Sequence, residues 1–91
     1  MTLDVNYMSV HGVVPKGSNI EDITVIAGKG VRNGIRDIKR LQASYPDYDP
    51  DFWQKKVGVV QGESFDYDVH WYANQDYSPE DEYKLKEARS K

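Results

Sequence analysis

The stretch from Thr24 to Leu41 reads TVIAGKGVRNGIRDIKRL and carries the strongest fold signals in the chain. An apolar run rich in β-branched residues is followed by a glycine-rich turn with one lysine, and then by apolar residues at helical spacing. The apolar run predicts a strand over residues 22–28. Because both faces of this strand are largely apolar, we expect it to lie in the centre of its sheet.

The second half of the stretch predicts the main helix, over residues 31–44. Its apolar side chains fall within a sector of roughly 120°, and they are Val31, Ile35, Ile38, Leu41 and Tyr45. The opposite side is basic, with Arg32, Arg36, Lys39 and Arg40. The helix is expected to begin at Val31 or to take Asn33 as its N-cap, and Pro46 is expected to end it.

Outside this stretch the pattern is mainly that of antiparallel strands. Residues 2–14 alternate between apolar and polar side chains, and a change of phase at Met8 and Val10 indicates a bulge or bend. Residues 57–60 and 65–73 predict a hairpin. Alternation along its second strand directs one set of side chains to a single face, and this set is Asp66, Asp68, His70 and Tyr72.

Two shorter helices complete the prediction. Asp49 before Pro50 is a favourable N-cap and N1 pair, which predicts a short helix over residues 50–56. Residues 78–81, Ser-Pro-Glu-Asp, resemble a capping box that opens a C-terminal helix ending near Arg89. The apolar stripe of this helix is thin, so we expect residues 79–91 to be peripheral or frayed.

The predicted fold class is therefore α+β, in a single domain that spans residues 1–91. It has a mainly antiparallel sheet of about four strands, with the main amphipathic helix packed on one face. The short second helix and the C-terminal helix complete it.

Composition narrows the class of protein. Of the 91 residues, 38% are hydrophobic and 30% are charged, which is typical of a globular domain rather than of a disordered chain. The absence of cysteine excludes disulfides and thiolate zinc sites and favours a cytoplasmic protein. No apolar run approaches the roughly 20 residues of a membrane span, and we expect no signal peptide because the N-terminal residues lack its pattern.

The glycine-rich turn is one candidate site. A helix that starts after such a turn presents backbone N–H groups and a positive dipole to an anion. The residues of this site are Gly28, Lys29, Gly30, Arg32, Asn33 and Arg36. They predict binding of a nucleotide or another phosphate ligand, with a homo-oligomer framing the pocket. The dinucleotide fingerprint fails because its third glycine falls at Asn33, and the alternative is a tight turn before a solvated basic helix.

Two patterns of acidic residues have the composition of a metal-binding site. Asp47-x-Asp49-x-Asp51 alternates as in a calcium loop, but Phe52 and Gly58 stand where an EF-hand needs Gly and Glu. Capping and turn formation explain these aspartates better. The set Asp66, Asp68 and His70 would suit a small metal-dependent hydrolase, although a charged edge hairpin explains it better. We assign no catalytic residue, metal or cofactor.

The leading hypothesis rests on aromatic residues among acids. Residues 1–45 contain six Lys or Arg and four Asp or Glu, whereas residues 46–91 contain six Lys or Arg and eleven Asp or Glu. The second half of the chain is therefore strongly acidic, although the net charge of the whole chain is only −3. Seven Tyr and two Trp exceed what a small core can hold. We expect Trp53, Phe65 and Trp71 in the core, and exposed tyrosines to anchor a partner.

These features predict a small non-catalytic binding protein, an inhibitor or adaptor whose partner has a basic surface. The predicted partner-binding residues are Tyr45, Asp47, Tyr48, Asp49, Asp51, Asp66, Tyr67, Asp68, Tyr72 and Tyr77. The overall acidity disfavours binding to nucleic acid. In size and composition the chain is similar to compact inhibitors and adaptors, including accessory proteins that phages encode, although no motif assigns it to a family.

Overall fold

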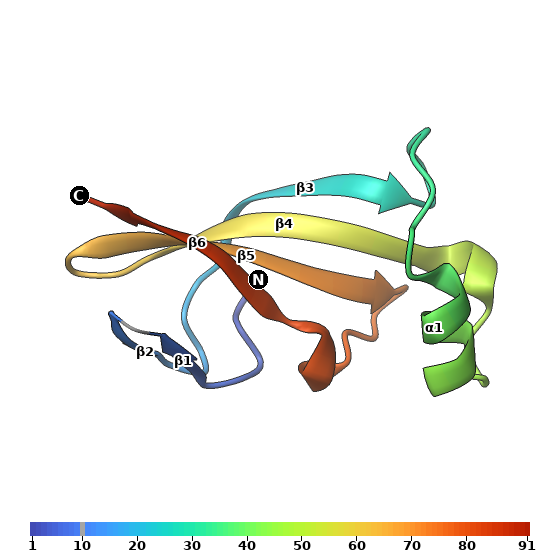
Figure 1. Ribbon diagram of the computed structural model, residues 1–91, viewed down its shortest axis with the longest axis horizontal. Coiled ribbons are helices and arrows are strands. Elements are labelled where there is room, and N and C mark those ends of the chain that lie inside the picture. Colours follow the sequence, from blue (N-terminus) through green and yellow to red (C-terminus); the bar gives the residue numbers. More distant parts are fainter. Residues whose placement is uncertain (10) are drawn as a thin grey trace.

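The computed structural model of the protein describes residues 1–9 and 11–91. In these residues four antiparallel strands form the main sheet, in the order β3-β4-β5-β6 (Figure 1). They are β3 (Glu21–Gly28), β4 (Trp53–Gln61), β5 (Phe65–Asn74) and β6 (Lys84–Ser90). A second, smaller sheet is formed by β1 (Tyr7–Ser9) and β2 (Gly12–Val14), whose antiparallel register places Met8 opposite Val13.

The helical segments of the described chain are short. They are α1 (Ile38–Ser44) and the 3₁₀ turns η1 (Pro50–Phe52) and η2 (Glu80–Glu82). Figure 1 shows α1 at one end of the main sheet, beside the start of β4 and the end of β5. No helix in the described residues has the length and apolarity needed to cross a membrane.

Two hydrophobic cores lie on the two faces of the main sheet. The first core lies between β4–β6 and the N-terminal segment, and its buried members are Leu3, Val14, Ile20, Val60, Tyr67, Val69, Trp71, Ala73 and Tyr83. The second core lies under α1, and its buried members are Ala27, Ile35, Leu41, Trp53 and Tyr72. Both tryptophans are buried as predicted, whereas Phe65 is only partly buried.

The predicted hairpin is confirmed, with longer strands. β4 and β5 pair continuously from Trp53 opposite Asn74 to Gln61 opposite Asp66. The predicted alternation along β5 also holds, because every second residue from Tyr67 to Ala73 lies in the first core.

The predicted C-terminal helix is wrong, because residues 84–90 form strand β6 against β5. Leu85 and Ala88 are three residues apart, which is a helical spacing. In the structure a register shift in the β5–β6 ladder lies between the pairs Val69–Leu85 and Asp68–Glu87. This bulge resets the alternation, so that Leu85 and Ala88 both pack against the first core. The predicted capping box is also wrong, because the turn η2 has Pro79 as its N-cap and no side-chain capping hydrogen bond.

The predicted main helix is also wrong in extent and placement. α1 has seven residues, starts at Ile38 with Asp37 as its N-cap, and covers one face of the sheet at one end only instead of packing across it. Residues 29–37 form turns and bends instead. Gly34, inside the predicted helix, disfavours a helix by about 1 kcal/mol relative to alanine. The observed fold is therefore two antiparallel sheets with one short α-helix in the described residues.

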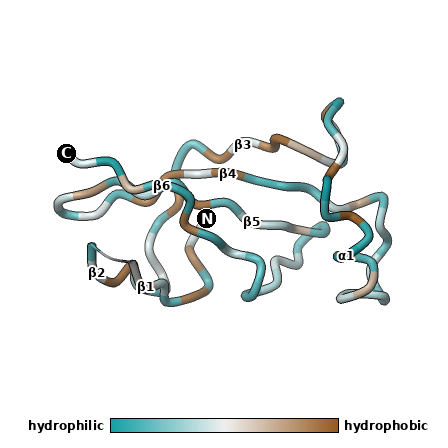
Figure 2. The backbone as a smooth tube through the Cα atoms, viewed as in Figure 1, coloured by the Kyte–Doolittle hydropathy of each residue, from teal (hydrophilic) through white to brown (hydrophobic). Residues whose placement is uncertain are grey.

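Strand β3 lies at the edge of the sheet rather than in its centre. Figure 2 shows hydrophobic segments along β3, which is why the sequence suggested a central strand. In the structure Ile23 is 39% exposed and Ile26 is 36% exposed. Two register shifts against β4 interrupt the strand, and such bulges are a usual protection of an exposed edge.

Two further predictions were partly correct. Asp49 does cap the segment that follows, because its side chain accepts a hydrogen bond from the Asp51 N–H at 2.9 Å. The helix predicted over residues 50–56 is wrong beyond Phe52, where β4 begins. The long strand predicted over residues 2–14 is replaced by β1, β2 and an isolated bridge between Thr2 and Asn19. The phase change predicted at Val10 lies outside the described residues.

Candidate functional site

Two loops at the α1 end of the sheet form one acidic surface with stacked tyrosines. The first loop is residues 45–52, which link α1 to β4, and the second is residues 74–81, which run from the end of β5 into η2. Together we call them the acidic aromatic surface. Buried Asn74 joins them, because its Nδ2 donates a hydrogen bond to the Asp49 carbonyl at 2.7 Å. The surface includes six predicted partner-binding residues, namely Tyr45, Asp47, Tyr48, Asp49, Asp51 and Tyr77.

The aromatic part of this surface is an ordered stack. The rings of Tyr48 and Tyr77 lie parallel within 8°, with their centroids 4.7 Å apart. The rings of Tyr48 and Tyr45 also pack against the ring of Trp53, with centroid-to-centroid distances of 6.1 Å and 5.5 Å. Because Trp53 is buried and Tyr77 is 38% exposed, the stack runs from the second core to the solvent. Such fixed aromatic area suits an interface anchor, since little side-chain entropy is lost on binding.

Carboxylates surround the stack. The exposed acidic residues of the two loops are Asp47, Asp49, Asp51, Asp76, Glu80 and Asp81. Within the part of the chain that the structure describes, none of them forms an ion pair. Their charge is therefore directed to the solvent, where it favours association with a basic surface.

An ion pair between half-exposed Arg40 and buried Glu82 fixes the base of this surface. Glu82 is only 7% exposed and accepts hydrogen bonds from Arg40 at 3.1 Å and 2.7 Å. Tyr45 donates its hydroxyl proton to the same carboxylate at 2.9 Å. The hydrogen bond from Arg40 lowers the pKa of Glu82, whereas burial and the bond to Glu82 raise the pKa of Tyr45 to about 12. The network thus joins α1, the 45–52 loop and η2 with both charged groups ionised at neutral pH.

The sequence pattern did not point to Glu82, Arg40 or Asn74 as parts of the site. Arg40 was assigned to a solvated basic face, and Glu82 to an exposed helix. A buried carboxylate is recognisable only from its partner, which here lies 42 residues away in the chain.

We expect Arg40→Met to destabilise the protein by about 1–3 kcal/mol at neutral pH, since it leaves Glu82 buried without its cation. The lower part of this range applies, because Arg40 is 45% exposed. Ionised Glu82, with its lowered pKa, contributes stability above its ordinary pKa, and this contribution is lost as pH falls through the lowered value. As pH rises from about 3 to about 6, the free energy of unfolding of Arg40→Met should therefore increase less than that of wild type.

Urea denaturation across this pH range would measure the difference. Arg36→Met is the matched control, because Arg36 is an exposed arginine for which the structure shows no ion pair among the described residues. Equal pH profiles for Arg40→Met and wild type would contradict the assigned role of the pair.

Two of the other predicted partner-binding residues are buried. Tyr67 lies in the first core, on the sheet face opposite α1. Tyr72 lies in the second core, and its hydroxyl donates a hydrogen bond to Asp37 at 3.1 Å. Burial and this bond raise the pKa of Tyr72 to about 12. Neither tyrosine presents its ring to a partner, and both belong to the packing of the sheet.

The predicted hydrolase residues lie on the same face of β5 as Tyr72, beyond the end that α1 covers. Asp68 pairs with Arg89 and Asp66 with Lys91, the latter at 3.5 Å, so both carboxylates are compensated by cations of the C-terminal segment. Burial lowers the pKa of His70, and nearby lysines lower it further. The described residues contain no group of three or more His, Cys, Asp or Glu arranged to hold a metal ion. Asp66 and Asp68 are also separate from the acidic aromatic surface.

The glycine-rich turn uses its backbone N–H groups internally. Gly28 N–H donates to the Asn33 carbonyl at 2.7 Å, and Lys29 N–H donates to the Trp53 carbonyl at 3.0 Å. The Lys29 ammonium lies 4.0 Å from the centre of the Phe52 ring. Gly30, Arg32, Asn33 and Arg36 are exposed. The free helix start on which the predicted phosphate site depended is absent from this segment of the described chain.

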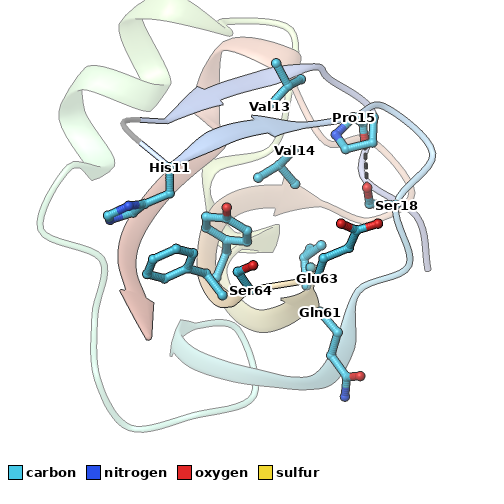
Figure 3. Close-up of a pocket in the computed structure, with 12 residues that line it drawn as sticks. His11, Val13, Val14, Pro15, Ser18, Gln61, Glu63 and Ser64 are labelled. Atoms are coloured by element: carbon cyan, nitrogen blue, oxygen red, sulfur yellow. Dashed lines mark hydrogen bonds between the residues drawn. The ribbon is translucent and has the colours of Figure 1, made fainter. Parts of the chain in front are cut away.

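A pocket of about 420 Å³ lies between the small sheet and the β4–β5 turn (Figure 3). Val14 points from β2 toward the aromatic side chains at its floor, and Val13 points away. His11 stacks on Phe65 with ring centroids 4.0 Å apart. Glu63 and Ser64 lie at the turn. The sequence did not predict this pocket, whose walls come from strands far apart in the chain.

Comparison of the chain with protein-family models, curated proteins and solved structures gave no match. The structure by itself describes a small β-rich protein with an acidic aromatic surface at one end of its main sheet.

Proposed function

We propose that this protein is a small non-catalytic binding protein, an inhibitor or adaptor, that contacts a basic surface of a partner protein. The proposal rests on the parallel stack of Tyr48 and Tyr77, with unpaired carboxylates around it. The aromatic pair supplies contact area and the carboxylates supply complementary charge. As part of the proposal the protein acts in the cytoplasm, which is supported by the absence of cysteine.

The surface is held in shape before any partner binds. Asn74 joins the two loops, and the Arg40–Glu82 pair fixes the ring of Tyr45 beneath them. Preorganisation of this kind lowers the entropic cost of association, so a small surface can bind tightly.

The two alternative functions have less support. Binding of a phosphate ligand at residues 28–36 relied on free N–H groups, and those of Gly28 and Lys29 are occupied. Hydrolysis through Asp66, Asp68 and His70 relied on a shared metal, and both carboxylates pair with cations instead.

We expect Tyr77→Ala combined with Asp47→Asn and Asp51→Asn to weaken binding to a cationic partner at least tenfold. Asp49 is left unchanged because it caps η1. The probe is a panel of lysine-rich and arginine-rich peptides, and then any protein captured from extract of the source cells. Amide NMR shifts should map to residues 45–52 and 74–81, and the association rate should fall with salt.

Glu63→Gln combined with Glu87→Gln is the control, since it removes the same charge from exposed positions elsewhere on the surface. Equal loss of binding in this control would show that binding depends only on the net charge of the protein. Normal binding by the Tyr77 variant would exclude the acidic aromatic surface.

A further inference from the structure

The face of the main sheet that carries the second core is covered by α1 at one end only (Figure 1). Beyond α1, this face bears His70 in the middle of β5. His70 lies opposite Val57 on β4 and opposite Lys84 on β6. Lys55 lies opposite Tyr72, and Lys86 stands at the bulge of β6. Three lysines from two different strands are thereby placed around one histidine.

His70 and the three lysines line a shallow concavity of about 60 Å³ beside Asp37, the N-cap of α1. The Lys55 ammonium lies 5.8 Å from the centre of the Tyr72 ring, which forms part of the lining. Asp37 and Glu82 also line it, but each already accepts a hydrogen bond, Asp37 from Tyr72 and Glu82 from Arg40.

The concavity carries an excess of positive charge, because its three lysines outnumber the two carboxylates in its lining, Asp37 and Glu82. Among the described residues, Lys55, Lys84 and Lys86 form no ion pair, whereas Arg40 neutralises Glu82. In addition, the Nδ1 atom of His70 is buried and has no hydrogen-bond partner in the described structure. Unpaired cations beside a histidine favour a ligand of opposite charge, and protonation of the imidazole gives it a further donor.

We propose that this concavity binds a small oxyanion, either free phosphate or the phosphate group of a monoester. The three ammonium groups supply the charge, and the imidazole supplies a hydrogen bond when it is protonated. The Tyr72 hydroxyl does not take part, because it is committed to Asp37. Glu82 lines the concavity and also holds Tyr45 beneath the acidic aromatic surface, but the three lysines and His70 belong to the concavity alone, so either proposal can fail without the other.

Anion binding should be coupled to the protonation of His70. The cations around His70 are Lys55 on β4 and Lys84 and Lys86 on β6. The carboxylates are Asp68, Asp37 and Glu82, and Arg40 on α1 is paired with Glu82. Burial lowers the pKa of His70, Lys55 and Lys86 lower it further, and Asp68 raises it. A bound dianion offsets the lysines and favours imidazolium, so it should raise this pKa. By linkage, the anion binds more tightly as pH falls through the pKa of His70.

The test is an NMR titration of the histidine Cε1–H signals, in which His11, the other of the two histidines, serves as an internal control. Sulfate is the first probe, because it stays a dianion between pH 5 and pH 8. Sodium chloride at matched ionic strength corrects for screening. We expect sulfate and phosphate to shift the His70 signal saturably and to raise its pKa by about one unit, with little change at His11.

Variants then assign the effect to the lysines. Lys55→Met combined with Lys86→Met should weaken sulfate binding at least tenfold. Lys16→Met combined with Lys39→Met removes the same charge from exposed positions elsewhere and should leave binding unchanged. Tighter binding of methyl phosphate than of inorganic phosphate would identify a monoester as the ligand, and the reverse order would identify the free ion.

Three results would overturn the proposal. The first is a His70 signal that does not shift saturably with sulfate or phosphate. The second is an equal shift with chloride, and the third is an equal loss of binding in the two lysine pairs.

Discussion

Replacing Trp53 with alanine is expected to lower the free energy of unfolding by about 3–5 kcal/mol. The indole is 1% exposed and lies in the second core with Leu41 of α1 and Tyr72 of β5. It also supports the rings of Tyr45 and Tyr48. Because α1 is only seven residues long, its stability depends on this contact rather than on its own hydrogen bonds. The variant should therefore lose α1 and the acidic aromatic surface together.

Urea denaturation followed by circular dichroism would give the free energy. Phe52→Ala is the matched control, since it deletes the neighbouring aromatic ring, which is only partly buried beneath the Lys29 ammonium. Its expected cost is about 1 kcal/mol. Equal costs at the two positions would show that Trp53 does not join the helix to the sheet.

Gly28→Ala is expected to destabilise the protein by about 2–4 kcal/mol through backbone strain and a steric clash. Gly28 ends β3 with φ +92°, a conformation that side chains disfavour. A Cβ atom here would overlap the carbonyl oxygen of Trp53 and lie 2.9 Å from Ile35 Cδ1. The glycine is thus required by the close approach of the turn to β4, and no phosphate ligand is needed to explain it.

Gly30→Ala separates the clash from the strain. Gly30 has φ +90°, but a Cβ atom there would meet nothing within 4 Å. Only the conformational cost applies, about 1–2 kcal/mol. Chemical denaturation of both variants should therefore give a clearly larger loss for Gly28→Ala. Similar losses would mean that the chain around Trp53 moves aside without cost.

Local patterns in the sequence determined several elements by themselves. The alternation along residues 65–73 predicted which side chains of β5 enter the first core, because successive residues of a strand point to opposite faces. Asp49 before Pro50 predicted a cap that the structure contains, since a capping bond joins residues two apart. The concentration of tyrosines among aspartates likewise marked residues 45–51 as one part of the acidic aromatic surface.

Only the tertiary structure decided what depends on distant partners. The spacing of Leu85 and Ala88 suits a helix and a bulged strand equally, and pairing with β5 selects the strand. The apolar run of β3 suits either a central or an edge strand. In the main sheet β3 pairs only with β4 among the described strands, so it is an edge strand. The acidic aromatic surface depends on the hydrogen bond between Asn74 and Asp49, which are 25 residues apart in the chain. It also depends on the ion pair between Glu82 and Arg40, which are 42 residues apart. Periodicity describes neighbours within a few residues, so it cannot specify contacts at such separations.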